Sequence, residues 1–175
     1  MLILGTIIFV FFILLIFVSR KHSPVPYFPT NKKDIPLIIK ALDLKNNKAV
    51  VDLGAGDGIV IFEAAKYAYD NSLKNKFYAV EINPILVLIM NLKRLFHKNR
   101  KNIYILRDDF TKMSLKRFKN AVFYLYLSPK YLQIVYKKIK KEAPNSKILS
   151  YFYKYKYLSK FKKINGENNL YKAVA

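Results

Sequence analysis

The feature that most constrains the fold is a glycine-rich turn directly after a short apolar run. Residues 48–53 read Lys-Ala-Val-Val-Asp-Leu, which is typical of a buried strand, and residues 54–58 read Gly-Ala-Gly-Asp-Gly. Residues 59–69 then read as a helix. Glycines let the backbone turn sharply and approach a ligand closely, and a helix N-terminus offers free N–H groups. The strand–turn–helix unit therefore predicts a ligand site at the turn.

The rest of the body alternates strands and helices. Further helices are expected at residues 31–42, 84–98 and 129–142, and further strands at residues 76–81, 102–107, 120–126 and 146–151. Such alternation predicts right-handed βαβ crossovers and a parallel sheet. Two last strands, residues 158–164 and 168–174, flank an Asn-Gly turn and predict an antiparallel hairpin. The expected fold class is α/β, a Rossmann-like, doubly wound and mostly parallel seven-stranded sheet that ends in this hairpin.

The first eighteen residues form an uncharged apolar segment. Apart from Gly5 and Thr6, residues 2–18 are all aliphatic or aromatic, and as a helix they would span about 26 Å, close to a hydrocarbon core of about 30 Å. Basic residues at positions 20 and 21 follow directly, so the positive-inside rule predicts that the N-terminus lies outside. We expect one N-terminal transmembrane helix. The alternatives are a signal peptide, which lacks its usual basic start and cleavage site here, and a buried core helix.

Three parts are therefore expected along the chain. They are a transmembrane anchor at residues 1–19, a proline-rich juxtamembrane segment at residues 20–30, and one domain at residues 31–175. The juxtamembrane segment holds three prolines between residues 23 and 30, which favour an extended and stiff conformation. The predicted localisation is a single-pass membrane protein whose domain lies in the cytoplasm.

The chain is strongly basic. Its 175 residues include 32 Lys and Arg against 11 Asp and Glu, for a net charge of +21. Nucleic acids, anionic lipids and acidic proteins are the partners that such a charge indicates. A drift of the genome toward A/T-rich codons would give the same excess of lysine. Cysteine is absent and histidine occurs twice, so no metal site is expected.

Acidic residues stand at the ends of three successive strands. Asp52 precedes the glycine turn, Glu81 closes the second strand and Asp109 follows the third. In a doubly wound sheet these positions share the edge where ligands bind. A carboxylate at Asp52 would repel a pyrophosphate, and the spacing is G-x-G-x-G rather than the dinucleotide G-x-G-x-x-G. A ligand with a ribose and an ammonium but no phosphate fits these positions, and S-adenosylmethionine is such a ligand.

At residues 51–58 the chain resembles the class I, or seven-stranded, S-adenosylmethionine-dependent methyltransferases. The resemblance covers residues 32–175 and implies that the glycine turn contacts the methionine part of the cofactor. It further implies that Glu81 holds the ribose and that Asp109 contacts the adenine amino group, with Phe110 beside the ring. The cofactor-binding residues that it implies are Asp52, Gly54, Ala55, Gly56, Gly58, Glu81, Ile82, Asp109 and Phe110.

A closer resemblance is to small, N-terminally anchored class I protein-lysine methyltransferases, the group that includes the ATP synthase c-subunit lysine methyltransferases. It rests on the anchor and on residues 26–30, 81–84 and 126–129. The Asn/Asp-Pro-Pro-Tyr sequence of many enzymes that methylate base amines is absent after the fourth strand. The resemblance implies a protein substrate that presents a lysine near the membrane, and a segment at residues 27–30 that folds over the cofactor. Three catalytic candidates follow: Tyr126 and Tyr27 to line a lysine channel, and Asp57 to orient the amine.

Other functions stay open. An RNA methyltransferase would explain the charge of +21. The predicted membrane anchor argues against this alternative. A small-molecule or lipid methyltransferase is compatible with the anchor. A membrane-tethered module that binds the cofactor without turnover, and an NAD-dependent oxidoreductase, are the remaining alternatives.

Overall fold

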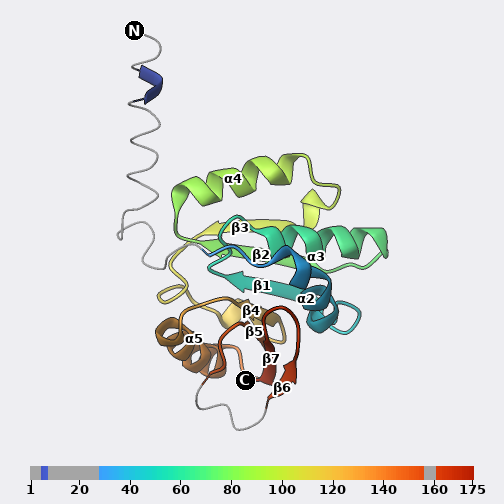
Figure 1. Ribbon diagram of the computed structural model, residues 1–175, viewed down its shortest axis with the longest axis vertical. Coiled ribbons are helices and arrows are strands. Elements are labelled where there is room, and N and C mark those ends of the chain that lie inside the picture. Colours follow the sequence, from blue (N-terminus) through green and yellow to red (C-terminus); the bar gives the residue numbers. More distant parts are fainter. Residues whose placement is uncertain (1–4, 8–27, 156–160) are drawn as a thin grey trace.

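The computed structural model describes residues 5–7, 28–155 and 161–175, and its core is a seven-stranded sheet with helices on both faces (Figure 1). The strand order is β3-β2-β1-β4-β5-β7-β6. Strands β1 to β5 run parallel, and β7 runs antiparallel to both β5 and β6. The bounds are β1 Ala49–Leu53, β2 Lys76–Glu81, β3 Ile103–Arg107, β4 Val122–Leu125, β5 Lys147–Tyr151, β6 Lys162–Ile164 and β7 Leu170–Val174. The predicted sheet with its terminal hairpin is confirmed.

Two hydrophobic cores lie on the two faces of this sheet, because alternate strand residues point to opposite sides. One core joins residues such as Val50 and Phe77 to the helices α2, α3 and α4. The other joins residues such as Val51 and Phe123 to α5. The bounds of the helices are α2 Ile35–Leu42, α3 Ile59–Asp70, α4 Pro84–Leu95 and α5 Pro129–Glu142, and those of the 3-10 turns are η1 Lys32–Asp34, η2 Arg100–Asn102 and η3 Lys116–Phe118.

Several predicted elements differ in their bounds from the observed ones, and three of the differences have clear local reasons. The helix expected at residues 31–42 starts as the turn η1, capped by the Asn31 side chain, and α2 begins only at Ile35. Helix α4 stops three residues early, where His97 bonds to the carbonyl of Phe62 and to the N–H of Asn99 instead of continuing the helix. Strand β4 starts late because Asn120 has a left-handed φ of 61°.

The predicted membrane anchor falls almost entirely on residues outside the described ones. Residues 5–7 are helical, and the remainder of residues 1–19, together with Tyr27, is not described. Within the described part of the chain, no helix combines the length and the apolar character needed to cross a bilayer. The first part of the predicted strand at 158–164 also lies outside, up to residue 160.

A buried carboxylate ties the start of the domain to its last hairpin. Asp34 accepts hydrogen bonds from the Tyr151 hydroxyl at 2.7 Å and from the backbone N–H groups of Glu167 and Asn168 at 2.8 and 2.9 Å. Burial alone would raise the pKa of Asp34, but these hydrogen bonds outweigh it and hold the pKa below its ordinary value. The segment before α2 is thereby fixed to β5 and to the turn between β6 and β7.

Removing this carboxylate should loosen both ends of the domain. We expect Asp34→Ala to lower the free energy of unfolding by about 2–3 kcal/mol, because a buried hydroxyl and two N–H groups lose a charged acceptor. Urea unfolding measures the change. The exposed Asp70 at the end of α3 is the matched control, and Asp70→Ala should stay within about 0.5 kcal/mol of wild type.

The difference in stability between wild type and Asp34→Ala should depend on pH in a defined direction. An acid whose pKa is lowered by folding adds stability above its unfolded pKa and loses that stability as the pH falls through the folded pKa. The gap between wild type and Asp34→Ala should therefore be complete near neutral pH and shrink below about pH 4. A gap that is constant down to acid pH would contradict a charged Asp34.

Candidate active site

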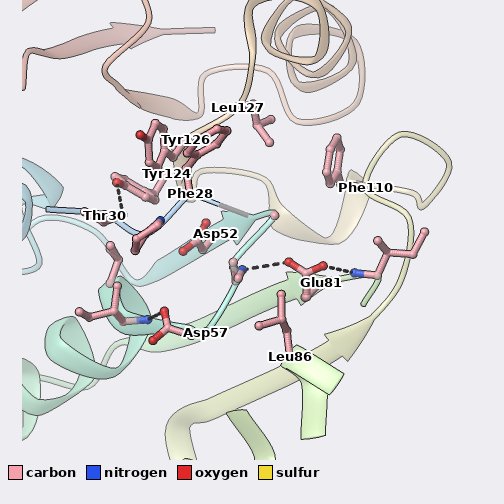
Figure 2. Close-up of a pocket in the computed structure, with 17 residues that line it drawn as sticks. Phe28, Thr30, Asp52, Asp57, Glu81, Leu86, Phe110, Tyr124, Tyr126 and Leu127 are labelled. Carbon is pink, nitrogen blue, oxygen red and sulfur yellow. Dashed lines mark hydrogen bonds between the residues drawn. The ribbon is translucent and has the colours of Figure 1, made fainter. Parts of the chain in front are cut away.

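A pocket opens at the carboxyl ends of β1, β2 and β4, where ligands bind in doubly wound sheets (Figure 2). It contains about 680 Å³ of space, part of which is open to solvent. Most of the predicted site residues line it, namely Asp52, Gly54, Ala55, Gly56, Asp57, Glu81, Ile82, Phe110 and Tyr126.

Two predicted residues do not line the pocket, and a third is not described. Gly58 caps α3 with a left-handed φ of 77°, and a Cβ there would lie 2.8 Å from the Met90 sulfur. Its role is thus to let α3 and α4 pack closely. Asp109 follows β3 as expected, but its carboxylate turns toward Thr111 and accepts from the N–H at 2.9 Å and the hydroxyl at 2.6 Å. Tyr27 lies outside the described residues.

Burial alone would raise the pKa of Asp109, but the hydrogen bonds from Thr111 and the charge of Lys112 hold it below its ordinary value. Asp109 is therefore a charged cap of its own turn. In this orientation the carboxylate does not line the pocket, and its contact with an adenine stays a prediction. Phe110, the next residue, does face the pocket and packs edge-on against Tyr131, with ring centroids 5.9 Å apart.

Asp52 is the unusual group in the pocket. It is almost fully buried, and no hydrogen bond or ion pair from any described residue reaches its carboxylate. Burial raises the pKa of Asp52 well above its usual range, and the nearby charges of Glu81 and Asp57 raise it further. A buried acid without a donor costs folding free energy, which a cationic ligand would recover.

Glu81 holds the two loops that frame the pocket. One carboxylate oxygen accepts from the N–H of Gly56 at 2.9 Å, and the other accepts from the N–H groups of Ile82 and Asn83, both at 2.9 Å. Gly56 has a φ of 58°, which aims its N–H at Glu81. Burial raises the pKa of Glu81, and the three hydrogen bonds offset this only in part. The residue thus joins the glycine turn after β1 to the end of β2.

Asp57 does not point freely into the pocket. Its carboxylate forms an ion pair with Lys93 of α4 at 2.8 Å and accepts weakly from the N–H of Ile59 at the start of α3. The pairing bridges the glycine turn and α4. Asp57 therefore lines the pocket as a paired and partly exposed group, in contrast to Asp52.

An aromatic wall closes the side of the pocket opposite Phe110 (Figure 2). The hydroxyls of Tyr124 and Thr30 lie 3.3 Å apart, and Phe28 adds an exposed ring at the entrance. Tyr126 packs edge-on against Tyr151 at 4.9 Å. Burial raises the pKa of Tyr124 and of Tyr126, so both phenols stay neutral at physiological pH. They offer hydrogen bonds but no base.

The sequence did not single out several lining residues. These are Ile59, Val60, Leu86 and Tyr124. Every residue of β4 is buried, so its apolar run carried no sign of which side chains face the pocket. Phe28, Pro29 and Thr30 do lie against it, as expected of a segment that folds over the site.

Solved structures share this fold. An RNA methyltransferase from Salinibacter ruber, in complex with S-adenosyl-L-homocysteine, superposes with a TM-score of 0.73 and 19% identity, over 84% of this chain and 93% of that one. The fold is that of the class I methyltransferases. A precorrin-6y C5,15-methyltransferase from Geobacter metallireducens matches with a TM-score of 0.62 and 14% identity, over 89% of this chain and 96% of that one. At such identities the likeness establishes the fold alone.

One curated protein is related in sequence over part of the chain. A probable ribosomal RNA small subunit methyltransferase A from Methanosphaera stadtmanae is 30% identical over 86 residues, which is 49% of this chain. The match spans only 29% of that protein's length. No family model matches the chain. None of these three relatives is named as a protein-lysine methyltransferase, so that resemblance stays a prediction.

Proposed function

We propose that this chain is an S-adenosylmethionine-dependent methyltransferase. The observation that carries the proposal is the buried, unpaired carboxylate of Asp52 beside a glycine turn at the end of β1. S-adenosylmethionine brings an ammonium and a sulfonium, and either positive charge would stabilise the ionised Asp52. A ligand that carries phosphates would worsen its electrostatic cost instead.

The other pocket residues fit the remaining parts of this cofactor. Glu81 keeps one carboxylate oxygen with a single hydrogen bond, which leaves an acceptor position for a ribose hydroxyl. Ile82, Leu86 and Phe110 provide apolar surface for an adenine ring. Asp109 does not line the pocket, because its carboxylate caps its own turn.

When bound, the cofactor supplies an activated methyl group. The chain itself then has to align an acceptor and to limit the access of water. Phe28, Pro29 and Thr30 cover the site, and Tyr124 and Tyr126 provide neutral hydroxyls beside it. Since no lining tyrosine is ionised, we propose that the acceptor loses its proton to solvent at the open mouth.

RNA is the acceptor with the wider support. The Salinibacter ruber structure and the Methanosphaera stadtmanae relative are both named as RNA methyltransferases. The charge of +21 would favour binding to phosphates. A lysine of a membrane protein is the second candidate. It is favoured by the aromatic wall, which could enclose an apolar stem, by the Tyr-Leu-Ser-Pro sequence at residues 126–129, and by the apolar segment at residues 2–18.

Calorimetry and methyl labelling test the proposal in turn. The full chain should bind S-adenosylmethionine with micromolar or better affinity and should not bind NAD. The full chain is then incubated with a radiolabelled methyl donor and either total RNA or membranes from the source cells. Nuclease-sensitive label would identify RNA, protease-sensitive label with methyl-lysine by mass spectrometry would identify protein, and solvent-extractable label would identify lipid. Absence of cofactor binding would refute the enzyme assignment altogether.

A strained aromatic residue next to Tyr126, which lines the pocket, gives a test of acceptor recognition. Phe152 follows β5 with a φ of 69°, a left-handed conformation that is rare for bulky residues, and it is 46% exposed. Its ring centroid lies 6.3 Å from that of Tyr126. Strain of about 1–3 kcal/mol is typical at functional positions.

We expect Phe152→Gly to raise the KM for the acceptor about fivefold, with cofactor affinity unchanged, because a ring contact worth about 1 kcal/mol is lost beside Tyr126. Steady-state kinetics with the acceptor found by labelling measures this. Phe152→Asn, which also tolerates the left-handed backbone, should behave alike. An unchanged KM in both variants would show that the ring does not touch the acceptor.

A further inference from the structure

Helix α4 carries apolar side chains on the face that points away from the core. Leu88, Leu92, Leu95 and Phe96 are 58%, 51%, 55% and 89% exposed. Their spacing of four, three and one residues places them on one stripe. Leu86 and Met90, on the opposite side of the helix, are buried in the pocket wall and the core. A helix that is apolar on both sides normally lies between two apolar environments.

No described element supplies the second environment. Figure 1 shows α4 at the outer edge of the helical layer, with only the sheet and its neighbouring helix on the inner side. Isolated exposed leucines need no explanation, but a contiguous stripe of four large side chains marks an interaction surface. The outer face of α4, defined here by Leu88, Leu92, Leu95 and Phe96, is such a surface.

The chain segment that carries this stripe is basic, although Asp57 and, on α3, Glu63 and Asp70 lie near it. Residues 82–107 contain six lysines and arginines and no Asp or Glu. Of these six residues, Lys93 forms an ion pair with Asp57. A depression at the carboxyl end of α4 brings three further basic residues together with the exposed ring of Phe96, namely Lys98, Arg100 and Lys101.

We propose that the outer face of α4 docks onto an anionic phospholipid bilayer. The leucines and Phe96 would enter the boundary between head groups and acyl chains, and Lys98, Arg100 and Lys101 would contact lipid phosphates. Amphipathic surfaces of this composition bind anionic membranes, with each basic residue near the surface contributing to the attraction. A second copy of the chain would bring two basic surfaces together, and RNA would leave the leucine stripe unburied.

The proposal does not depend on methyltransferase activity or on whether residues 2–18 cross a membrane. It does have a consequence for the pocket, because α4 lines the pocket with Leu86, only two residues before Leu88. Docking would therefore hold the pocket close to the membrane surface.

Site-directed spin labelling of the full chain tests this contact. The sequence has no cysteine, so a single introduced cysteine carries the only label. We would label Leu92→Cys and Phe96→Cys on α4, with Ile134→Cys on α5 as the matched exposed control. Each is mixed with vesicles of phosphatidylcholine alone or with phosphatidylserine added. The measurement is the accessibility of the label to oxygen relative to a water-soluble nickel chelate.

Both α4 labels should show a several-fold rise in this ratio with phosphatidylserine vesicles, and the α5 label should show none. Adding Lys98→Glu and Lys101→Glu to Phe96→Cys should abolish the rise, because the charge complementarity is lost. Three outcomes would overturn the proposal: α4 labels that stay aqueous with anionic vesicles, labels that become buried without lipid as protein concentration rises, and labels that are shielded by RNA but not by vesicles.

Discussion

Asp52→Asn should strongly weaken cofactor binding and, at the same time, make the ligand-free protein more stable. Asparagine keeps the shape of the side chain but removes a charge that is buried without a partner. Losing one member of a buried charge pair costs about 2–5 kcal/mol of binding free energy, so the dissociation constant should rise at least about 30-fold. The free protein should become more stable, because it no longer holds a poorly solvated carboxylate near Glu81 and Asp57.

Calorimetry and urea unfolding on the same samples separate the two effects. Asp109→Asn is the matched control, since Asp109 lies outside the pocket and is held by Thr111. It should lose a little stability and keep its affinity for S-adenosylmethionine. If Asp52→Asn bound the cofactor as tightly as wild type, the electrostatic basis of the proposed function would be wrong.

The same carboxylate makes cofactor binding dependent on pH. Burial raises the pKa of Asp52, so part of the free protein is protonated there at a pH where an ordinary aspartate is ionised. A cationic ligand favours the ionised form and therefore expels a proton. Affinity should fall as the pH is lowered through the raised pKa, and the binding enthalpy should vary with the ionisation enthalpy of the buffer. Asp52→Asn should lose both effects.

Glu81→Ala should remove cofactor binding and also destabilise the fold, by about 3–5 kcal/mol. Three backbone N–H groups, those of Gly56, Ile82 and Asn83, lose their acceptor at once, and each such group costs about 1–3 kcal/mol when it is left unsatisfied. Urea unfolding should show the loss without any ligand present. A residue that only held a ribose would leave the unfolding midpoint unchanged.

Glu81→Gln separates the roles further. The amide keeps one oxygen acceptor but turns an NH₂ group toward the backbone donors, so stability should fall between those of wild type and Glu81→Ala. Unchanged stability in both variants, with cofactor affinity lost, would restrict Glu81 to the ligand.

Much of the scaffold follows from the sequence because strand ends and helix starts carry local signals. The bounds of β2 and of α5 are those predicted, since Glu81 is followed by the Asn83 cap and Pro84, and Pro129 opens a helix of clear periodicity. The glycine turn and Asp52 were predictable because backbone geometry and residue type coincide there. These features place the pocket at the correct edge of the sheet.

The orientations of the other acids were not predictable to the same degree. Asp109 turns away because Thr111, two residues later, offers both an N–H and a hydroxyl, a competition that residue spacing alone does not resolve. Asp57 pairs with Lys93, 36 residues along the chain, which only the packing of α3 against α4 brings within reach. The aromatic wall depends on similar long-range contacts, such as that between Thr30 and Tyr124.

The hydrogen bonds of Asp34 join residues that are synthesised at very different times. Thr30, which covers the pocket, stands four residues before Asp34, whereas Glu167 and Asn168, which hold that carboxylate, leave the ribosome more than a hundred residues later. The segment that covers the pocket is thus tied, through Asp34, to a turn that emerges near the end of synthesis, whereas its contact with Tyr124 is available earlier. A ribosome-stalled chain that ends before Glu167 would lack both N–H donors of Asp34, and we expect this segment to be less firmly held there than in the full chain.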